Sequence, residues 1–98
     1  MKGSEKQIRW AEDLKENVVK CIDAVVEGNR NAPAQYKEQA DAIVTIWENR
    51  KTKLLACDSA SKIIDYFQFF KPTGNINSDV MSVNAIYETT LNNGYEFK

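Results

Sequence analysis

Some residues of this chain could bind a metal or transfer protons. Acidic side chains are scattered over residues 12–27, and Glu12 and Glu16 share one helical face at i, i+4 spacing. Two carboxylates hold a hard cation only with further oxygen ligands, and Lys15 lies between these two. Histidine, the commonest general base and metal ligand, is absent. We therefore expect no catalytic, cofactor-binding or metal-binding residues, and no enzyme.

A basic run is the second chemical feature. Arg50, Lys51 and Lys53 lie close together with aromatic residues nearby, as in a nucleic-acid-binding surface. Thirteen basic and fourteen acidic residues give a net charge of -1, so the chain as a whole exerts no attraction for phosphates. The helix expected at 78–90, the candidate for reading DNA, has no Lys or Arg. A solvated helix face is the simpler interpretation, and a nucleic-acid-binding accessory protein is the alternative.

The elements that would position these residues are helices. Ser4 and Gln7 form a capping-box pattern at the start of the first helix, and Gly28 is typical of its end. Apolar residues recur at spacings of three and four between them. They are Ile8, Ala11, Leu14, Val18, Cys21 and Val25.

A second helix is predicted to open near Pro33. Its apolar stripe has a heptad-like spacing, which favours packing against the first helix as an antiparallel hairpin. The stripe consists of Tyr36, Ala40, Ile43, Trp47, Arg50 and Leu54.

Two shorter helices are expected beyond the hairpin. Residues 61–70 favour a helix capped at Asp58 or Ser59, although this helix and the second could equally run together. A strand is the rival because β-branched and aromatic residues abound. A fourth helix follows a cap at Asn77 or Ser78, and residues 92–94 are expected to end it. The predicted fold class is all-α, as one domain over residues 1–98.

Arg50 occupies a position in the apolar stripe where a buried residue is expected. With the hairpin turn near residues 29–31, Arg50 would face Ala11, stack on Trp10 and pair with Glu12 or Asp13. Trp10, Glu12, Trp47 and Arg50 would then form a structural cluster that fixes the register. The alternative is a partner-binding face made of Arg50, Lys51 and Lys53.

The segment IIDYFQFF is unusually apolar. Six large apolar residues in eight cannot all face one core if this helix lies at the surface. Exposure of Tyr66, Phe69 and Phe70 would make an interaction surface or a homo-oligomer contact. Complete burial in a central helix is the alternative.

The remaining features concern the cellular setting. Cys21 and Cys57 lie far apart without a CxxC pattern, so we expect reduced, buried thiols. Neither a signal peptide nor a membrane-spanning apolar run is evident. We expect a cytoplasmic protein that does not bind membranes.

Two stretches carry a resemblance. GSEKQIRWAEDLK, residues 3–15, resembles the opening GSEKQIxWAExIK of small uncharacterised phage and plasmid proteins of Gram-positive bacteria. IWENRK, residues 46–51, is similar to the WIDNR segment of that family, with Glu48 where the family often has Asp. The resemblance covers roughly the first half of the chain and implies mobile-element cargo. By analogy, we expect an interaction protein that inhibits a host defence protein, as anti-CRISPR proteins do.

Overall fold

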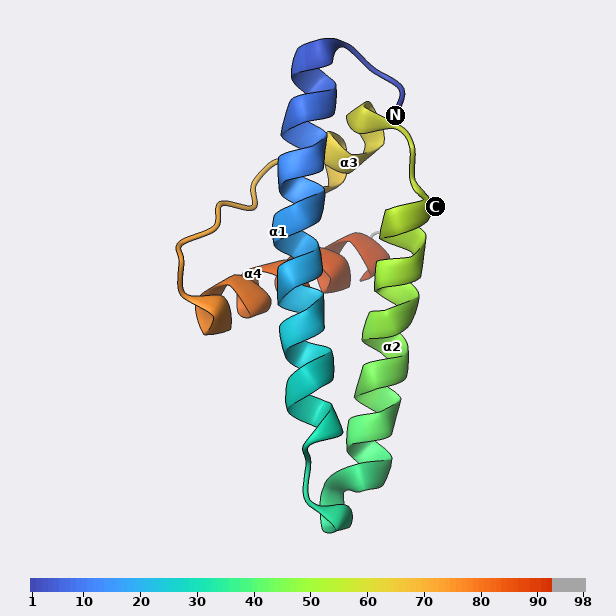
Figure 1. Ribbon diagram of the computed structural model, residues 1–98, viewed down its shortest axis with the longest axis vertical. Coiled ribbons are helices and arrows are strands. Elements are labelled where there is room, and N and C mark those ends of the chain that lie inside the picture. Colours follow the sequence, from blue (N-terminus) through green and yellow to red (C-terminus); the bar gives the residue numbers. More distant parts are fainter. Residues whose placement is uncertain (93–98) are drawn as a thin grey trace.

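The fold is a long antiparallel helical hairpin crossed by two shorter helices (Figure 1). The computed structural model describes residues 1–92, so the predicted end of the last helix at residues 93 and 94 lies outside the described residues. Within that range the predicted all-α class is confirmed. In chain order the elements are α1 Glu5–Arg30, the 3₁₀ turn η1 Ala34–Tyr36, α2 Lys37–Ala56, α3 Ala60–Phe67 and α4 Ile76–Asn92.

Helix α1 begins where the sequence predicted but ends later. Ser4 Oγ accepts a hydrogen bond from the backbone N–H of Gln7 at 3.2 Å, and Gln7 Oε1 accepts from that of Ser4 at 3.0 Å. The capping box is therefore confirmed. Gly28 stays inside the helix, whose C-cap is Asn31. Asn31 Nδ2 donates to the carbonyl of Glu27 at 3.1 Å, which satisfies one of the last four helical carbonyls without a glycine cap.

The first residues are tied to the junction between α2 and α3. Lys2 and Ser59 form a parallel bridge, in which the N–H of Lys2 donates to the Asp58 carbonyl and that of Ala60 donates to the Lys2 carbonyl at 2.8 Å. Gly3 then leads into α1 with a φ of +145°, and a Cβ there would lie 2.9 Å from the Cβ of Ala60. Only glycine fits both this backbone angle and this space.

Helix α1 lies at the centre of the core and contacts α2, α3 and α4. Its buried stripe follows the predicted periodicity, and Val18 and Ile22 have no exposed surface. The largest fully buried side chain of the core is Phe67 of α3. Further core members from the other helices are Trp47, Leu54, Ile63, Ile64, Val83 and Tyr87.

Residues Ala60–Phe67 form a helix separate from α2, so the rival strand and a continuous second helix are both wrong. Helix α3 ends at Phe67, where the N–H of Phe70 donates to the Phe67 carbonyl at 2.9 Å. This turn takes the chain out of the helical period, so that Phe70 is buried while Phe69 is 85% exposed.

Asn75, rather than the expected Asn77 or Ser78, caps α4. Its Oδ1 accepts from the N–H of Asn77 at 3.1 Å and from that of Ser78 at 3.3 Å. In the first turn of α4, the buried carboxylate of Asp79 accepts from the N–H and the hydroxyl of Thr73, both at 2.9 Å. A carboxylate is favoured at a helix N-terminus, so Asp79 fixes the α3–α4 connector at low cost.

The half of the hairpin nearest η1 is a single layer. In Figure 1, α4 crosses the hairpin near its middle, and α3 lies toward the other end. Of the predicted α2 stripe, Ala40, Trp47 and Leu54 are buried, whereas Tyr36 and Ile43 are exposed. The apolar stripe of α2 is therefore longer than the part of it that other helices bury.

We expect Gly3→Ala to lower the free energy of unfolding by about 1–3 kcal/mol, because the added methyl group meets Ala60 and the positive φ disfavours a side chain. Gly28→Ala is the matched control. It adds a methyl group inside α1 where no atom lies within 4 Å, and should raise stability by about 0.5–1 kcal/mol. Urea unfolding at equilibrium measures both. Equal effects would contradict the tight approach at Gly3.

Candidate functional site: the groove between α2 and α4

Arg50 joins α2 to α4. Its Cζ atom lies 4.7 Å from the ring centroid of Trp47 and 4.6 Å from that of Tyr87. Its Nη1 donates to Oδ1 of Asn84 at 3.1 Å. A cation over two aromatic faces is attracted by both, and the aliphatic stem covers apolar surface. These contacts explain why an arginine occupies a position in an apolar stripe.

Arg50 is partly buried. Burial lowers the pKa of Arg50 from its ordinary value, and Tyr87, Tyr66 and Glu88 oppose that shift. The guanidinium nevertheless stays charged at neutral pH. Burial also raises the pKa of Tyr87, whose ring meets that of Trp47 edge to face, so the phenol stays neutral. The contact therefore consists of one permanent cation between neutral rings.

A groove of about 400 Å³ opens beside this contact. We call it the α2–α4 groove, and Met81, 73% exposed, is its most exposed apolar residue. Asn84 separates its two charged groups, since Asn84 Nδ2 donates to Glu88 Oε1 at 3.2 Å while Oδ1 accepts from Arg50. The groove lining includes Val25, Ile43, Ile46, Arg50, Met81, Asn84 and Glu88.

The predicted structural cluster is only partly correct. Trp47 and Arg50 are in contact, but Trp10 is 48% exposed and is not part of the Arg50 contact. Arg50 turns to α4, so its predicted pairing with Glu12 or Asp13 of α1 is wrong.

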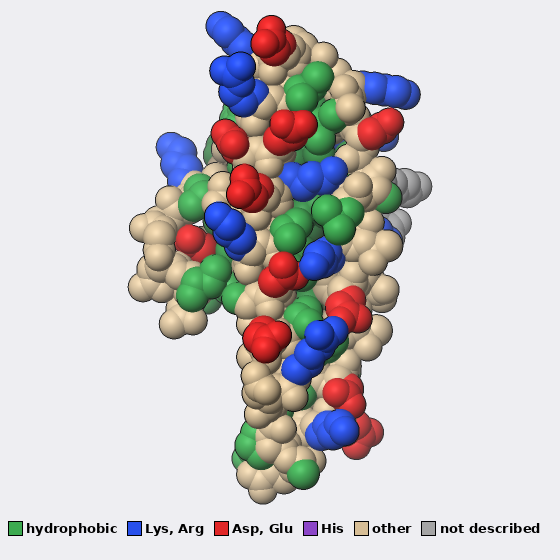
Figure 2. Space-filling model, in the orientation of Figure 1, with side chains coloured by type: hydrophobic (Ala, Val, Ile, Leu, Met, Phe, Trp, Pro, Cys, Tyr) green, Lys and Arg blue, Asp and Glu red, His purple; other side chains and the backbone are tan. Residues whose placement is uncertain are grey.

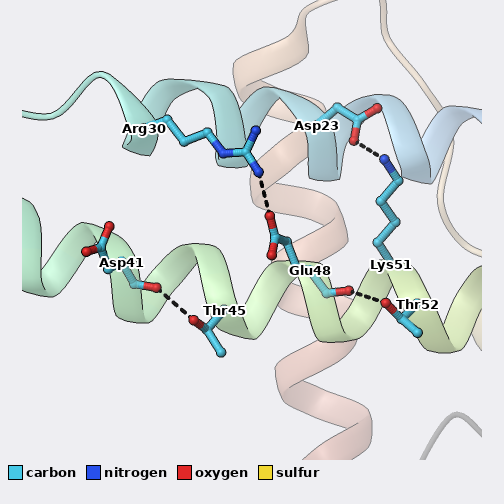
Figure 3. A network of polar contacts seen from close by, with 7 residues as sticks. All are labelled: Asp23, Arg30, Asp41, Thr45, Glu48, Lys51 and Thr52. Atoms are coloured by element: carbon cyan, nitrogen blue, oxygen red, sulfur yellow. Dashed lines mark hydrogen bonds and ion pairs between the residues drawn. The ribbon is translucent and has the colours of Figure 1, made fainter.

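Ion pairs across the hairpin show the actual register (Figure 3). Lys51 Nζ lies 2.7 Å from Asp23 Oδ1, and Arg30 Nη2 lies 2.7 Å from Glu48 Oε1. All four side chains are partly exposed, so each pair contributes little to stability. Their value here is geometric, because they show which residues of α1 and α2 lie opposite each other.

The register differs from the sequence interpretation because the turn lies later in the chain. Since Lys51 lies opposite Asp23, Arg50 also lies near that part of α1. Its predicted neighbour, Ala11, is about three helical turns away along α1. The interpretation centred the turn on residues 29–31, whereas α1 continues to Arg30 and η1 belongs to the connection.

The predicted basic face is divided between two sides of α2. Lys51 pairs with Asp23 of α1, whereas Arg50 turns to α4. Lys53 lies exposed in the last turn of α2. On the hairpin face shown in Figure 2, basic and acidic side chains alternate. The three residues do not form a single basic patch.

Of the three aromatics predicted to bind a partner, only Phe69 lies at the surface. Tyr66 and Phe70 are buried. The Tyr66 ring lies 4.8 Å from that of Phe67 and 5.5 Å from that of Tyr87, measured between centroids. Tyr66 and Phe70 therefore belong to the core, as the alternative held, whereas Phe69 is exposed and complete burial of the segment is wrong.

Lys15 has a role that the sequence did not reveal. Its Nζ donates to the carbonyl of Leu55 at 3.4 Å and to that of Cys57 at 3.1 Å. An ammonium at the C-terminal end of α2 satisfies carbonyls that the helix leaves open. The partners lie 40 and 42 residues away in the chain, so no local pattern could have indicated the contact.

Both thiols are free and buried. Burial raises the pKa of Cys21 to about 11, and the nearby carboxylate of Asp79 contributes to the increase. Cys21 is therefore protonated at neutral pH and is a poor nucleophile. Within residues 1–92, no three His, Cys, Asp or Glu side chains gather as a metal site would require.

The fold and the groove define a small all-α protein with an exposed apolar surface. A family model described as "Protein of unknown function (DUF725)" matches residues 4–93, so the chain belongs to this family. Neither the search of curated proteins nor that of solved structures finds a significant match. In the described part of the chain, no helix has the length and apolarity needed to cross a membrane.

We expect Arg50→Ala to lower the free energy of unfolding by about 1–3 kcal/mol, because it removes a partly buried hydrogen bond and leaves two rings without their cation. Arg9→Ala is the control, since Arg9 is largely exposed and should change stability by less than about 0.5 kcal/mol. Chemical denaturation of both variants tests this. An effect of Arg50→Ala no larger than that of Arg9→Ala would disprove the structural role.

Cys21 should make stability fall at alkaline pH. The pKa of the Cys21 thiol is its ordinary 9.0 in the unfolded chain and about 11 in the folded protein. Between these values the unfolded chain releases a proton that the folded protein keeps, so stability decreases as the pH rises through this window. Unfolding free energies of the wild type and Cys21→Ala, compared from pH 8 to about pH 11, isolate this contribution. If the unfolding free energies of the two proteins fell equally with pH, the Cys21 thiol would not be buried as described.

Proposed function

We propose that this protein is a non-enzymatic protein-interaction module that binds its partner at the α2–α4 groove. The observation that carries the proposal is the convergence of exposed Ile43, Ile46 and Met81 on a groove also lined by Arg50. Apolar side chains around a hollow, with an arginine among them, are typical of protein-binding surfaces. Arg50 is held at the groove by its contacts with the rings of Trp47 and Tyr87.

The partner we propose is a host defence protein in the cytoplasm of a Gram-positive bacterium. The support is the resemblance of residues 3–15 and 46–51 to proteins of mobile elements. The protein would inhibit its partner by covering a surface of it, as anti-CRISPR proteins do. The comparison with anti-CRISPR proteins is an analogy. The DUF725 family carries no assigned activity from which a function could be transferred.

The alternative, binding of nucleic acid, has less support. Lys51 is already paired with Asp23, and charges of both signs cover the hairpin face in Figure 2. A phosphate backbone is bound by a surface of one sign. The mixed surface favours a protein partner.

Met81→Asp should abolish partner capture, because it introduces a charge into the apolar groove while leaving the core untouched. Leu55→Asp is the control, since Leu55 is also an exposed apolar residue but lies outside the groove lining. Pull-downs with the tagged wild type and both tagged variants from a nuclease-treated Gram-positive lysate test this. Mass spectrometry identifies the proteins recovered.

We expect one protein to be recovered by the wild type and by Leu55→Asp, and to be lost with Met81→Asp. If that protein is a defence nuclease, its inhibition should show the same dependence. Recovery that Met81→Asp leaves unchanged would place the binding surface elsewhere. Recovery of replication or transcription proteins would support the nucleic-acid alternative.

A further inference from the structure

We propose that, in the isolated protein, a second copy of this chain occupies the α2–α4 groove, the two copies being related by a twofold axis. This inference rests on the proposed function in one respect: it assigns the same groove as a protein-binding surface. It adds the identity of an occupant, which the exposed apolar surface and the charges of the groove both indicate.

The first argument concerns missing cover. Helices with an apolar stripe are stable when a second layer covers that stripe. Helices α3 and α4 supply this layer over one half of the hairpin, and the half nearest η1 has none (Figure 1). Ile43 and Ile46 are exposed there, beside Met81 of α4. A second hairpin laid against this half would complete a layered helical bundle.

The second argument concerns charge. Arg50 uses one N–H to donate to Asn84, and no carboxylate within residues 1–92 forms an ion pair with it. A guanidinium has five N–H donors, so it retains capacity for a carboxylate. Glu88, exposed on the same groove, accepts from Asn84 and has no ion pair with any described residue.

A twofold axis would satisfy both groups at once. In a twofold interface, if residue i of one copy meets residue j of the other, then j meets i. Arg50 of each copy can therefore face Glu88 of the other, around an apolar centre formed by Ile46 and Met81. A uniformly acidic partner would be repelled by Glu88 and a uniformly basic one by Arg50. A second copy carries one of each.

Sedimentation velocity and light scattering of the purified full chain test the proposal. A small interface implies a weak dimer, so we would examine concentrations from about 5 µM to about 500 µM. The wild-type mass should rise from one copy toward two over this range. Met81→Asp should remain monomeric throughout.

Phe69→Asp is the control, because Phe69 is more exposed than Met81 but lies outside the groove lining. It should dimerise as the wild type does. Glu88→Lys should weaken dimerisation at least about tenfold, because the introduced lysine would face Arg50 of the other copy. Added salt should weaken the wild-type dimer and have less effect on the dimer of Glu88→Gln. Circular dichroism verifies that every variant is folded.

A wild type that stays monomeric at all concentrations would overturn this inference while leaving partner capture from a lysate intact. A dimer that resists Met81→Asp and Glu88→Lys but is lost with Phe69→Asp would overturn the location. A dimer that behaves as expected, in a protein that captures no other protein, would support this inference and contradict the proposed function alone.

Discussion

The Arg50 guanidinium lies over the ring faces of both Trp47 and Tyr87, and so joins α4 to the α2 side of the hairpin. Helix α4 packs on α1 and α3, and its side chains reach α2 through this cation, its hydrogen bond to Asn84 and the edge-to-face contact of the aromatic rings. Because the link lies in the middle of α4, that part of the helix is held beside α2, and Met81 is the most exposed large apolar residue described in α4. The groove is a consequence of this crossing.

Local features of the sequence were sufficient to predict the helices. The capping box of Ser4 and Gln7 and the periodic stripe of α1 depend on residues three or four positions apart, which helical geometry brings together. The class of the fold follows from such patterns. The hairpin itself was also predictable, because a short connection makes consecutive helices neighbours.

Relations between helices were beyond the reach of these patterns. The turn lies a few residues later than predicted, and Arg50 of α2 contacts α4 instead of α1. Apolar periodicity alone does not determine where the turn lies. The groove was missed for a related reason. Ile46 lies outside the predicted stripe of the second helix, and no role was predicted for Met81. Only the crossing of α4 over the hairpin brings the two side chains to one groove. The burial of Tyr66 likewise depends on the packing of α3 against α1 and α4.

The bridge between Lys2 and Ser59 has a consequence for the order of folding events. Contacts within the hairpin join residues through a single turn, whereas this bridge links the start of the chain to a point beyond both long helices. Closing so long a segment is entropically unfavourable until the intervening chain is already compact. We therefore expect the close approach of Gly3 to Ala60 to form late in folding, after the hairpin is in place.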